Sequence, residues 1–216
     1  MLAWHFLSED KRLGYGDGRL VEVGETLECK GDPALCSNGM HGSVRLIDAL
    51  HYASGPIVCR VEIEGDVIED EDKLCGRRRT VLWMMDATQL LHEFACQCAE
   101  DALALVEQPD ERSVKAIEAK RKWLNGEVTD EELASARAAS WAASRAASHA
   151  VAYAASWAAS WAAVRSASRA AAWAAQDAAS AAARAAARDA AWDAAWAKQN
   201  ERLTAMVMEA HEKESV

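Results

Sequence analysis

The chain has 216 residues, of which 51% are hydrophobic and 27% are charged, and its formal net charge is -10 at pH 7. Through Asp130 there are 25 acidic and 15 basic residues, so the N-terminal part carries the whole negative charge. This balance argues against nonspecific binding of nucleic acid, which needs basic groups to displace phosphate counterions.

Composition divides the chain into two parts. All eleven glycines and all three prolines lie at or before Gly126, and the rest is rich in alanine, the best helix former. We therefore predict an α+β domain over residues 1–108, a connecting helix over 109–128, and an alanine-rich helical segment over 129–216.

The first elements expected in chain order are short. Ala3 to Leu7 is predicted to form a strand. A glycine-rich turn over residues 14–18 and a short strand from Arg19 to Val23 follow. Ser43 is predicted to cap a helix that continues to about Ala53.

Two strands and a helix are expected next. Ile57 to Ile63 alternates apolar with polar side chains, which is typical of a half-buried strand. Thr80 to Met85 is a second apolar strand, and a helix is predicted from Asp86 towards Val106.

Capping signals define the two helices that follow. Asp110 begins one helix, and the pair Asn125 and Gly126 ends it. Thr129 with Glu132 three residues later forms a capping box, which opens the alanine-rich segment.

From Ser140 to Gln199 the chain repeats every four residues, a bulky or charged residue followed mostly by two alanines. Each step advances about 400° around an α-helix, so the bulky side chains wind around the axis instead of forming one stripe. The aromatic side chains therefore need cover on several sides, either from a helical bundle or from a coiled-coil-like oligomer. We assign assembly to Trp141, Tyr153, Trp157, Trp161, Trp173, Trp192 and Trp196.

Residues 146–164 carry no formal charge over a length close to that of a membrane span. They consist mainly of alanine with serine and histidine, and such residues supply little transfer energy. We expect no membrane insertion. The first twelve residues reach charges by residue 9 and show no secretory signal, so a cytoplasmic location with reduced thiols is expected, in the host cell if a phage encodes the chain.

Candidate metal ligands lack a recognisable spacing. No CxxC or HxxxH pattern occurs among Cys29, Cys36, His41, His51, Cys59 and Cys75. We predict buried cysteines, no metal and no cofactor, and we assign no catalytic residue. A zinc site or a Cys/His nucleophilic pair is the alternative.

An acidic run over residues 62–72 precedes three consecutive arginines, Arg77, Arg78 and Arg79. The run lacks the spacing of a calcium loop. The arginines can bind a phosphate or a carboxylate in bidentate fashion, or they can pair with the neighbouring acidic residues.

The stretch CSNGMHGSVRLIDALHYASGPIVCRVEIEGDV over residues 36–67, with WHFLSED, GDGRLVEVGETL and RRRTVLWMMDATQLLHEFA, resembles an uncharacterised domain family of bacteriophages and bacteria. Members are often joined to an alanine-rich tail. The resemblance covers roughly residues 3–105 and implies no catalytic residue. A Gly-x-His-x-Ser element at Gly39, His41 and Ser43, followed by a helix ending at Tyr52, is similar to a segment of ADP-ribosyltransferase-type folds.

These observations predict a non-enzymatic, phage-type module that binds a ligand or a protein and is assembled through its tail. The resemblance implies a role against host antiviral defence. The predicted partners are a second copy of the chain and a nucleotide-like small molecule or host defence protein, without direct nucleic-acid or membrane binding. The predicted ligand-binding residues are His41, Ser43, Tyr52, Arg77, Arg78 and Arg79.

Three alternatives stay open. The first is an enzyme that handles NAD or nucleotides, the second is a purely structural assembly protein, and the third is an acidic mimic of DNA.

Overall fold

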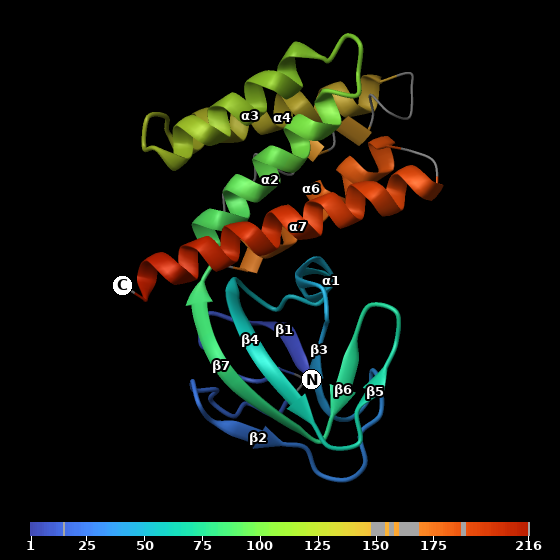
Figure 1. Cartoon of the computed structure of the whole chain (residues 1–216). Coiled ribbons are helices and arrows are strands. Elements are labelled where there is room, and N and C mark those ends of the chain that lie inside the picture. Colours follow the sequence, from blue (N-terminus) through green and yellow to red (C-terminus); the bar gives the residue numbers. More distant parts are fainter. Residues whose placement is uncertain (15, 148–153, 156–157, 160–168, 187–188, 216) are drawn as a thin grey trace. The chain divides into compact units, whose positions relative to one another are not determined.

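The computed structural model describes the chain except residues 15, 148–153, 156–157, 160–168, 187–188 and 216. Tyr153, Trp157 and Trp161, three of the predicted assembly residues, lie outside the described residues, as does the side chain of Trp192. The chain divides into two compact units, one comprising Met1–Ala87 with Val207–Val216 and the other Thr88–Met206. The predicted class, α+β followed by helices, is confirmed (Figure 1).

The first unit is built on two antiparallel sheets (Figure 1). One has the order β1-β4-β7-β2, with β1 at Leu2–Leu7, β4 at Ile57–Glu64, β7 at Arg78–Asp86 and β2 at Thr26–Glu28. The other has the order β3-β6-β5, with β3 at Met40–Gly42, β6 at Leu74–Gly76 and β5 at Ile68–Glu69. A short helix, α1, spans Leu46–His51.

The predicted strands at Ala3–Leu7, Ile57–Ile63 and Thr80–Met85 are confirmed as β1, β4 and β7. Their inward side chains form one apolar core with side chains of the second sheet and of the loops, and it includes Ile63 and Val81. Burial of this apolar surface is the main force that holds the strands together.

Ser43 does not cap a helix. Helix α1 begins at Leu46, and its N-cap residue is Arg45, which makes no side-chain capping bond. Ser43 is buried and exchanges two backbone hydrogen bonds with Trp4 of β1, at 2.8 and 2.9 Å. This bridge joins the two sheets. It satisfies the backbone N–H and C=O of Ser43, so these groups belong to a strand pairing and not to the start of a helix.

Gly42 permits the close approach of β3 to the larger sheet. A Cβ atom at this position would lie 2.9 Å from Cδ1 of Ile63 and 3.0 Å from the Trp4 carbonyl oxygen. Only a residue without a side chain fits there.

The predicted strand at Arg19–Val23 is wrong. Leu20 makes only an isolated bridge with Arg12, and the edge strand β2 forms later along the chain. The side chain of Arg19 instead binds Asp17 through Nε and Nη2, both at 2.7 Å. Local side-chain to backbone and side-chain to side-chain bonds of this kind favour a turn.

The second unit consists of helices (Figure 1). They are α2 at Thr88–Leu103, α3 at Glu111–Leu124, α4 at Asp130–Ala146, α6 at Arg169–Ala186, and α7 at Asp189–Glu214, whose residues through Met206 belong to this unit.

The capping predictions for α3 and α4 are confirmed. The Asp110 side chain accepts from the Arg112 backbone, and Asn125 is the C-cap of α3. Thr129 and Glu132 form the reciprocal capping box of α4. These bonds satisfy backbone groups at the helix ends that have no partner within the helix. The capping residues lie within a few positions of those groups, so the sequence alone predicts both helix ends.

The alanine-rich segment forms several helices rather than one rod in the part that the structure describes. Helix α4 packs against α3, and α6 packs against α2. In α6 the alanines are buried at 174, 175, 178, 179, 182 and 183, whereas Trp173 is 48% exposed. Small side chains let two helices approach closely, so the repeat supplies an alanine contact face and leaves the bulky residue outside.

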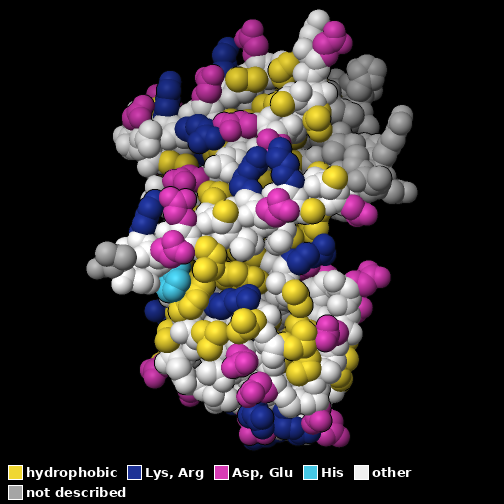
Figure 2. Space-filling view, in the orientation of Figure 1, with side chains coloured by type: hydrophobic (Ala, Val, Ile, Leu, Met, Phe, Trp, Pro, Cys, Tyr) yellow, Lys and Arg dark blue, Asp and Glu magenta, His cyan; other side chains and the backbone are white. Residues whose placement is uncertain are grey.

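The other described assembly residues are also incompletely buried, since Trp141 is 37% exposed and Trp196 is half-buried. Assembly of copies of the chain stays a prediction. Among the described residues, no helix combines the length and apolar content needed to cross a bilayer. On the face shown in Figure 2, acidic and basic side chains are interspersed, without one continuous basic patch.

Candidate functional site

Arg79 is a buried cation in the core of the first unit. Its side chain is on the same face of β7 as Val81 and is only 3% exposed. Nη1 donates to the backbone oxygen of His41 at 2.7 Å, while Nε is buried without a hydrogen-bond partner in the described part of the chain. Burial lowers the pKa of Arg79 to about 10, so the guanidinium is still charged at neutral pH.

Two histidines lie near this guanidinium. Burial, followed by the charge of Arg79, holds the pKa of His5 well below its usual value. Burial also lowers the pKa of His41, partly offset by a contact of 2.9 Å between Nδ1 and the Gly39 carbonyl oxygen. Nε2 of His41 is buried and has no hydrogen-bond partner among the described residues. Both rings are therefore neutral at pH 7.

Cys59 is the register partner of one residue of the buried cluster and of one residue that lines a surface pocket. It pairs with His5 of β1 on one side and with Met84 of β7 on the other. Burial raises the pKa of its thiol to about 12, and the charges of Arg79 and Lys11 oppose that rise only weakly. Cys59 thus lies within electrostatic reach of both cations, and it is a neutral thiol.

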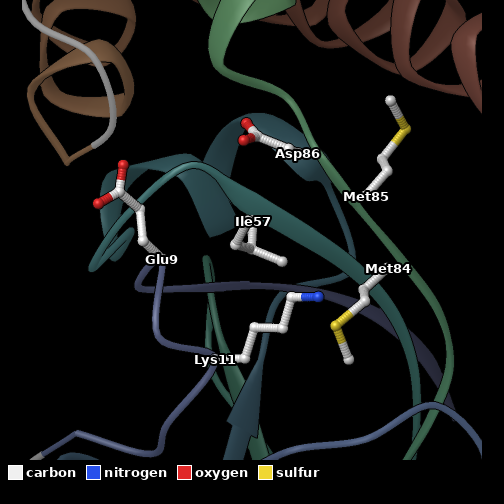
Figure 3. A pocket seen from close by; sticks show the side chains of 6 residues that line it. All are labelled: Glu9, Lys11, Ile57, Met84, Met85 and Asp86. Atoms are coloured by element: carbon white, nitrogen blue, oxygen red, sulfur yellow. The ribbon is translucent and has the colours of Figure 1, made fainter.

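A pocket of about 360 Å³ is lined in part by Met84, the register partner of Cys59. Its lining residues come from the loop after β1, from the start of β4 and from the end of β7, and they are Glu9, Lys11, Ile57, Met84, Met85 and Asp86 (Figure 3). In Figure 3 the carboxylates of Glu9 and Asp86 lie on one side of Ile57, and the Lys11 ammonium extends towards Met84 on the other. Lys11 has a left-handed backbone, with φ at 54°, which is strained for a residue with a side chain.

The three predicted arginines are not equivalent. Arg77 pairs with Asp66 at 2.8 Å and with Asp32 at 3.1 Å. Arg78 lies 3.8 Å from Glu64 and is largely exposed. Only Arg79 enters the core, because side chains alternate between the two faces of a strand.

The other predicted ligand-binding residues also divide. His41 contacts Arg79 through its backbone oxygen, whereas Ser43 is used in the bridge to β1. The Tyr52 hydroxyl donates to Asp72 at 2.5 Å and accepts from Lys73 at 3.3 Å. Of the six residues, the structure therefore brings His41 and Arg79 into direct contact.

The cysteines offer no activated nucleophile in the core. All six are free thiols, and burial raises the pKa of Cys59, Cys75, Cys96 and Cys98. A raised pKa lowers the thiolate fraction, and the thiolate is the reactive form. No group of three or more His, Cys, Asp or Glu side chains is arranged to hold a metal ion in the described part of the chain.

From the sequence, neither His5 of the buried cluster nor Lys11 of the pocket is singled out. Nor is Cys59 placed between His5 and Met84 in the sheet. His5 lies two residues from both Ala3 and Leu7 in the predicted first strand. Period-two alternation therefore places its side chain on the same face as theirs. Nothing in the sequence marks Lys11, because its direction depends on a left-handed backbone in a loop.

The neutral histidines predict a loss of stability in acid. Because folding lowers their pKa, the folded state binds fewer protons than the unfolded state, and stability falls once the pH drops below about 6.5. The maximal slope is about 1.4 kcal/mol per pH unit for each histidine. Urea unfolding between pH 7 and 5 measures it, and a His5→Gln variant should show a shallower loss. An identical slope in the variant would contradict the assignment to His5.

Residues 1–93 match the family model described as a domain of unknown function (DUF7666). The match covers β1 through the first turns of α2 and therefore includes the whole pocket and the buried cluster. Comparisons with curated proteins and with solved structures give no match. The part of the chain that carries the candidate site thus resembles an uncharacterised domain family.

Proposed function

We propose that the first unit is a non-enzymatic module that binds a small molecule in the pocket lined by Ile57, Met84 and Lys11. The observation that carries the proposal is the pocket itself. Its volume of about 360 Å³ lies within the range typical of small-ligand sites. Apolar side chains of Ile57, Met84 and Met85 supply contact area, and the charged Glu9, Lys11 and Asp86 supply orientation.

Binding is favoured over catalysis because the groups suited to catalysis are inactive or engaged. The Cys59 thiol is protonated at neutral pH. The Tyr52 hydroxyl is held between Asp72 and Lys73. A general base needs a proton within hydrogen-bond reach, and Nε2 of His41 is buried below the surface.

The test uses the full chain and a mixture of small metabolites, with bound species detected by native mass spectrometry. We expect a ligand to be retained unchanged in mass and to be lost from Met84→Trp, which fills the pocket. Leu82→Trp is the matched control, since Leu82 is an exposed residue of the same strand outside the pocket. Retention by Met84→Trp and wild type alike would exclude this pocket as the site.

The enzymatic alternative is tested in parallel with NAD and nucleotides. We expect no conversion of these compounds by the purified chain. Turnover that His41→Ala abolishes would replace the binding module by a nucleotide-handling enzyme.

Assembly through the helical tail is the second part of the proposal. It is supported by the partial exposure of Trp141 and Trp173, because large aromatic side chains contribute strongly to interfaces. Light scattering on the full chain tests it. A monomer at all concentrations would restrict the alanine-rich segment to intramolecular packing.

A further inference from the structure

The pocket has an apolar floor and a charged rim. The floor consists of the buried residues Ile57 and Met85, and the rim consists of the exposed residues Glu9, Lys11 and Asp86. An apolar group of a ligand gains free energy by leaving water for the floor, while the charges of the ligand can stay at the solvated rim. The pocket therefore favours a ligand that combines an apolar body with charged ends.

One turn presents both Glu9 and Lys11 to the pocket. The Lys11 backbone N–H donates to the Ser8 carbonyl oxygen at 2.9 Å, which closes the turn. A Cβ atom at Gly55 would lie 2.6 Å from the Ser8 Cα atom, so only glycine lets the turn pack against the chain that leads into β4. This packing holds the two charged residues beside Ile57, the first residue of β4.

The third charged residue of the turn, Asp10, is used within the turn itself. Its Oδ1 accepts from the Ser8 hydroxyl at 2.6 Å and from the Arg12 backbone N–H at 3.2 Å. The bond from Ser8 is the main cause of the lowered pKa of Asp10. Glu9 and Lys11, in contrast, form no ion pair with each other or with another residue that the structure describes. Their charges can therefore serve a ligand.

The opposite charges of the rim lie apart. In Figure 3 the carboxylates of Glu9 and Asp86 are on one side of Ile57, and the Lys11 ammonium is on the other. A ligand that meets both must hold its own charges apart by the width of that side chain. In a free α-amino acid the ammonium and the carboxylate share one carbon atom, whereas in a dipeptide a further residue, about 3.5 Å of extended chain, separates them. The rim favours the longer spacing.

We propose that the pocket binds a short apolar peptide with free ends, of the size of a dipeptide, with its ammonium at Glu9 and Asp86 and its carboxylate at Lys11. The inference rests on the proposed binding function and names its ligand class. The volume of about 360 Å³ lies at the lower end of the range for small-ligand sites, which suits a ligand of this size. Met84 is unbranched and flexible, so it adapts to different apolar side chains. The site thus selects the ends of the peptide and tolerates variation between them.

The experiment measures binding of L-leucyl-L-leucine to the full chain by isothermal titration calorimetry, at pH 7 and low salt. One analogue, 4-methylpentanoyl-L-leucine, lacks only the ammonium, and another, L-leucyl-3-methylbutylamide, lacks only the carboxylate. We expect each analogue to bind about threefold more weakly, the effect of one ion pair at an exposed rim. Free L-leucine should bind at least about tenfold more weakly, because it buries one side chain fewer and cannot reach both sides.

Two variants assign each end of the peptide to a side chain. In Lys11→Gln the dipeptide and the analogue without a carboxylate should bind equally, because Lys11 is the cation among the lining residues. In Glu9→Gln the advantage of the ammonium should fall below about twofold, with Asp86 as the remaining carboxylate. Glu22→Gln and Lys30→Gln are the matched controls, since they remove the same charges at exposed positions outside the pocket. Both controls should keep the wild-type ratios.

A readout in the wild-type protein locates the ligand without any substitution. When the methionine methyl groups are labelled with ¹³C, the resonances of Met84 and Met85 should shift on titration with the dipeptide. Met1 is the internal reference and should not shift. Its amino group donates to the carbonyl oxygen of Ile63, at the opposite end of β4 from Ile57.

Four results would overturn the inference: equal binding of the dipeptide and both analogues, free leucine that binds as tightly as the dipeptide, unchanged ratios in Lys11→Gln, or Met84 and Met85 resonances that do not respond. If the dipeptide fails while another small molecule binds in a manner sensitive to Met84→Trp, the ligand class is wrong and the binding function stands. If no small molecule binds, both fall.

Discussion

Raising the pH from 7 to 10 is expected to remove about 6 kcal/mol of stability through three buried thiols, about 2 kcal/mol for each. Burial raises the pKa of Cys59 to about 12 and of Cys96 to about 11, and it raises the pKa of Cys98 as well. All three side chains are completely buried.

The sign follows from proton binding. The folded state keeps these thiols protonated, whereas unfolded cysteines ionise near pH 8.5. Their contribution to stability is therefore complete below that value and is lost as the pH rises towards the folded pKa. Cys59 acts on the first unit, and Cys96 and Cys98 act on the second.

Urea unfolding of Cys98→Ala and wild type at pH 7 and 10 isolates one thiol. The variant should lose about 2 kcal/mol less than wild type over this interval. Leu103→Val, a buried change in the same helix without a titratable group, should lower stability equally at both pH values. Parallel behaviour of Cys98→Ala and wild type would show that Cys98 ionises in the folded state.

Replacing Lys120 by methionine is expected to stabilise the second unit by as much as about 3 kcal/mol at pH 7. Lys120 has no exposed surface, and burial lowers its pKa to about 8. Its Nζ lies 3.8 Å from the ring centroid of Trp123, a cation–π contact that recovers part of the desolvation cost. Methionine occupies a similar volume without the charge.

The gain should depend on pH in a defined way. Because folding lowers the Lys120 pKa, wild type recovers stability as the pH rises from about 8 to the unfolded value near 10.4. The difference between Lys120→Met and wild type should therefore shrink over that interval. Lys115→Met on the same helix is the control, because Lys115 is exposed and pairs with Glu111 at the surface. Its effect should stay within about 0.5 kcal/mol. A destabilised Lys120→Met protein would mean that the favourable contacts of the ammonium, including the one with the Trp123 ring, outweigh the cost of its burial.

Some features of the candidate site can be predicted from the sequence, and others cannot. The sequence predicts His41 and Arg79 as ligand-binding residues, but it does not predict their contact, since the hydrogen bond between them spans 38 residues. Period-two alternation places Arg79 with Val81 and opposite to Arg78, so the strand pattern already separates the arginines once β7 is accepted. That only Arg79 lacks a carboxylate depends on the acidic residues that the fold places beside Arg77 and Arg78.

The sequence by itself determined the features that depend on neighbours a few residues apart. The ends of α3 and α4 follow from caps at Asp110, Asn125 and Thr129, and β4 follows from its alternation. The α+β class and the helical C-terminal segment follow from composition.

Only the tertiary structure decided which long-range partners compete for the same groups. Ser43 has the sequence signature of a helix cap, but Trp4 takes its backbone bonds. The alanine repeat predicts helix in every register, but packing against α2 and α3 divided its described part into separate helices. The physical reason is the same in both cases. A local sequence signal is compatible with more than one structure. The partner that finally pairs with a buried backbone group or covers an apolar face is distant in the sequence, and only the folded chain brings it there.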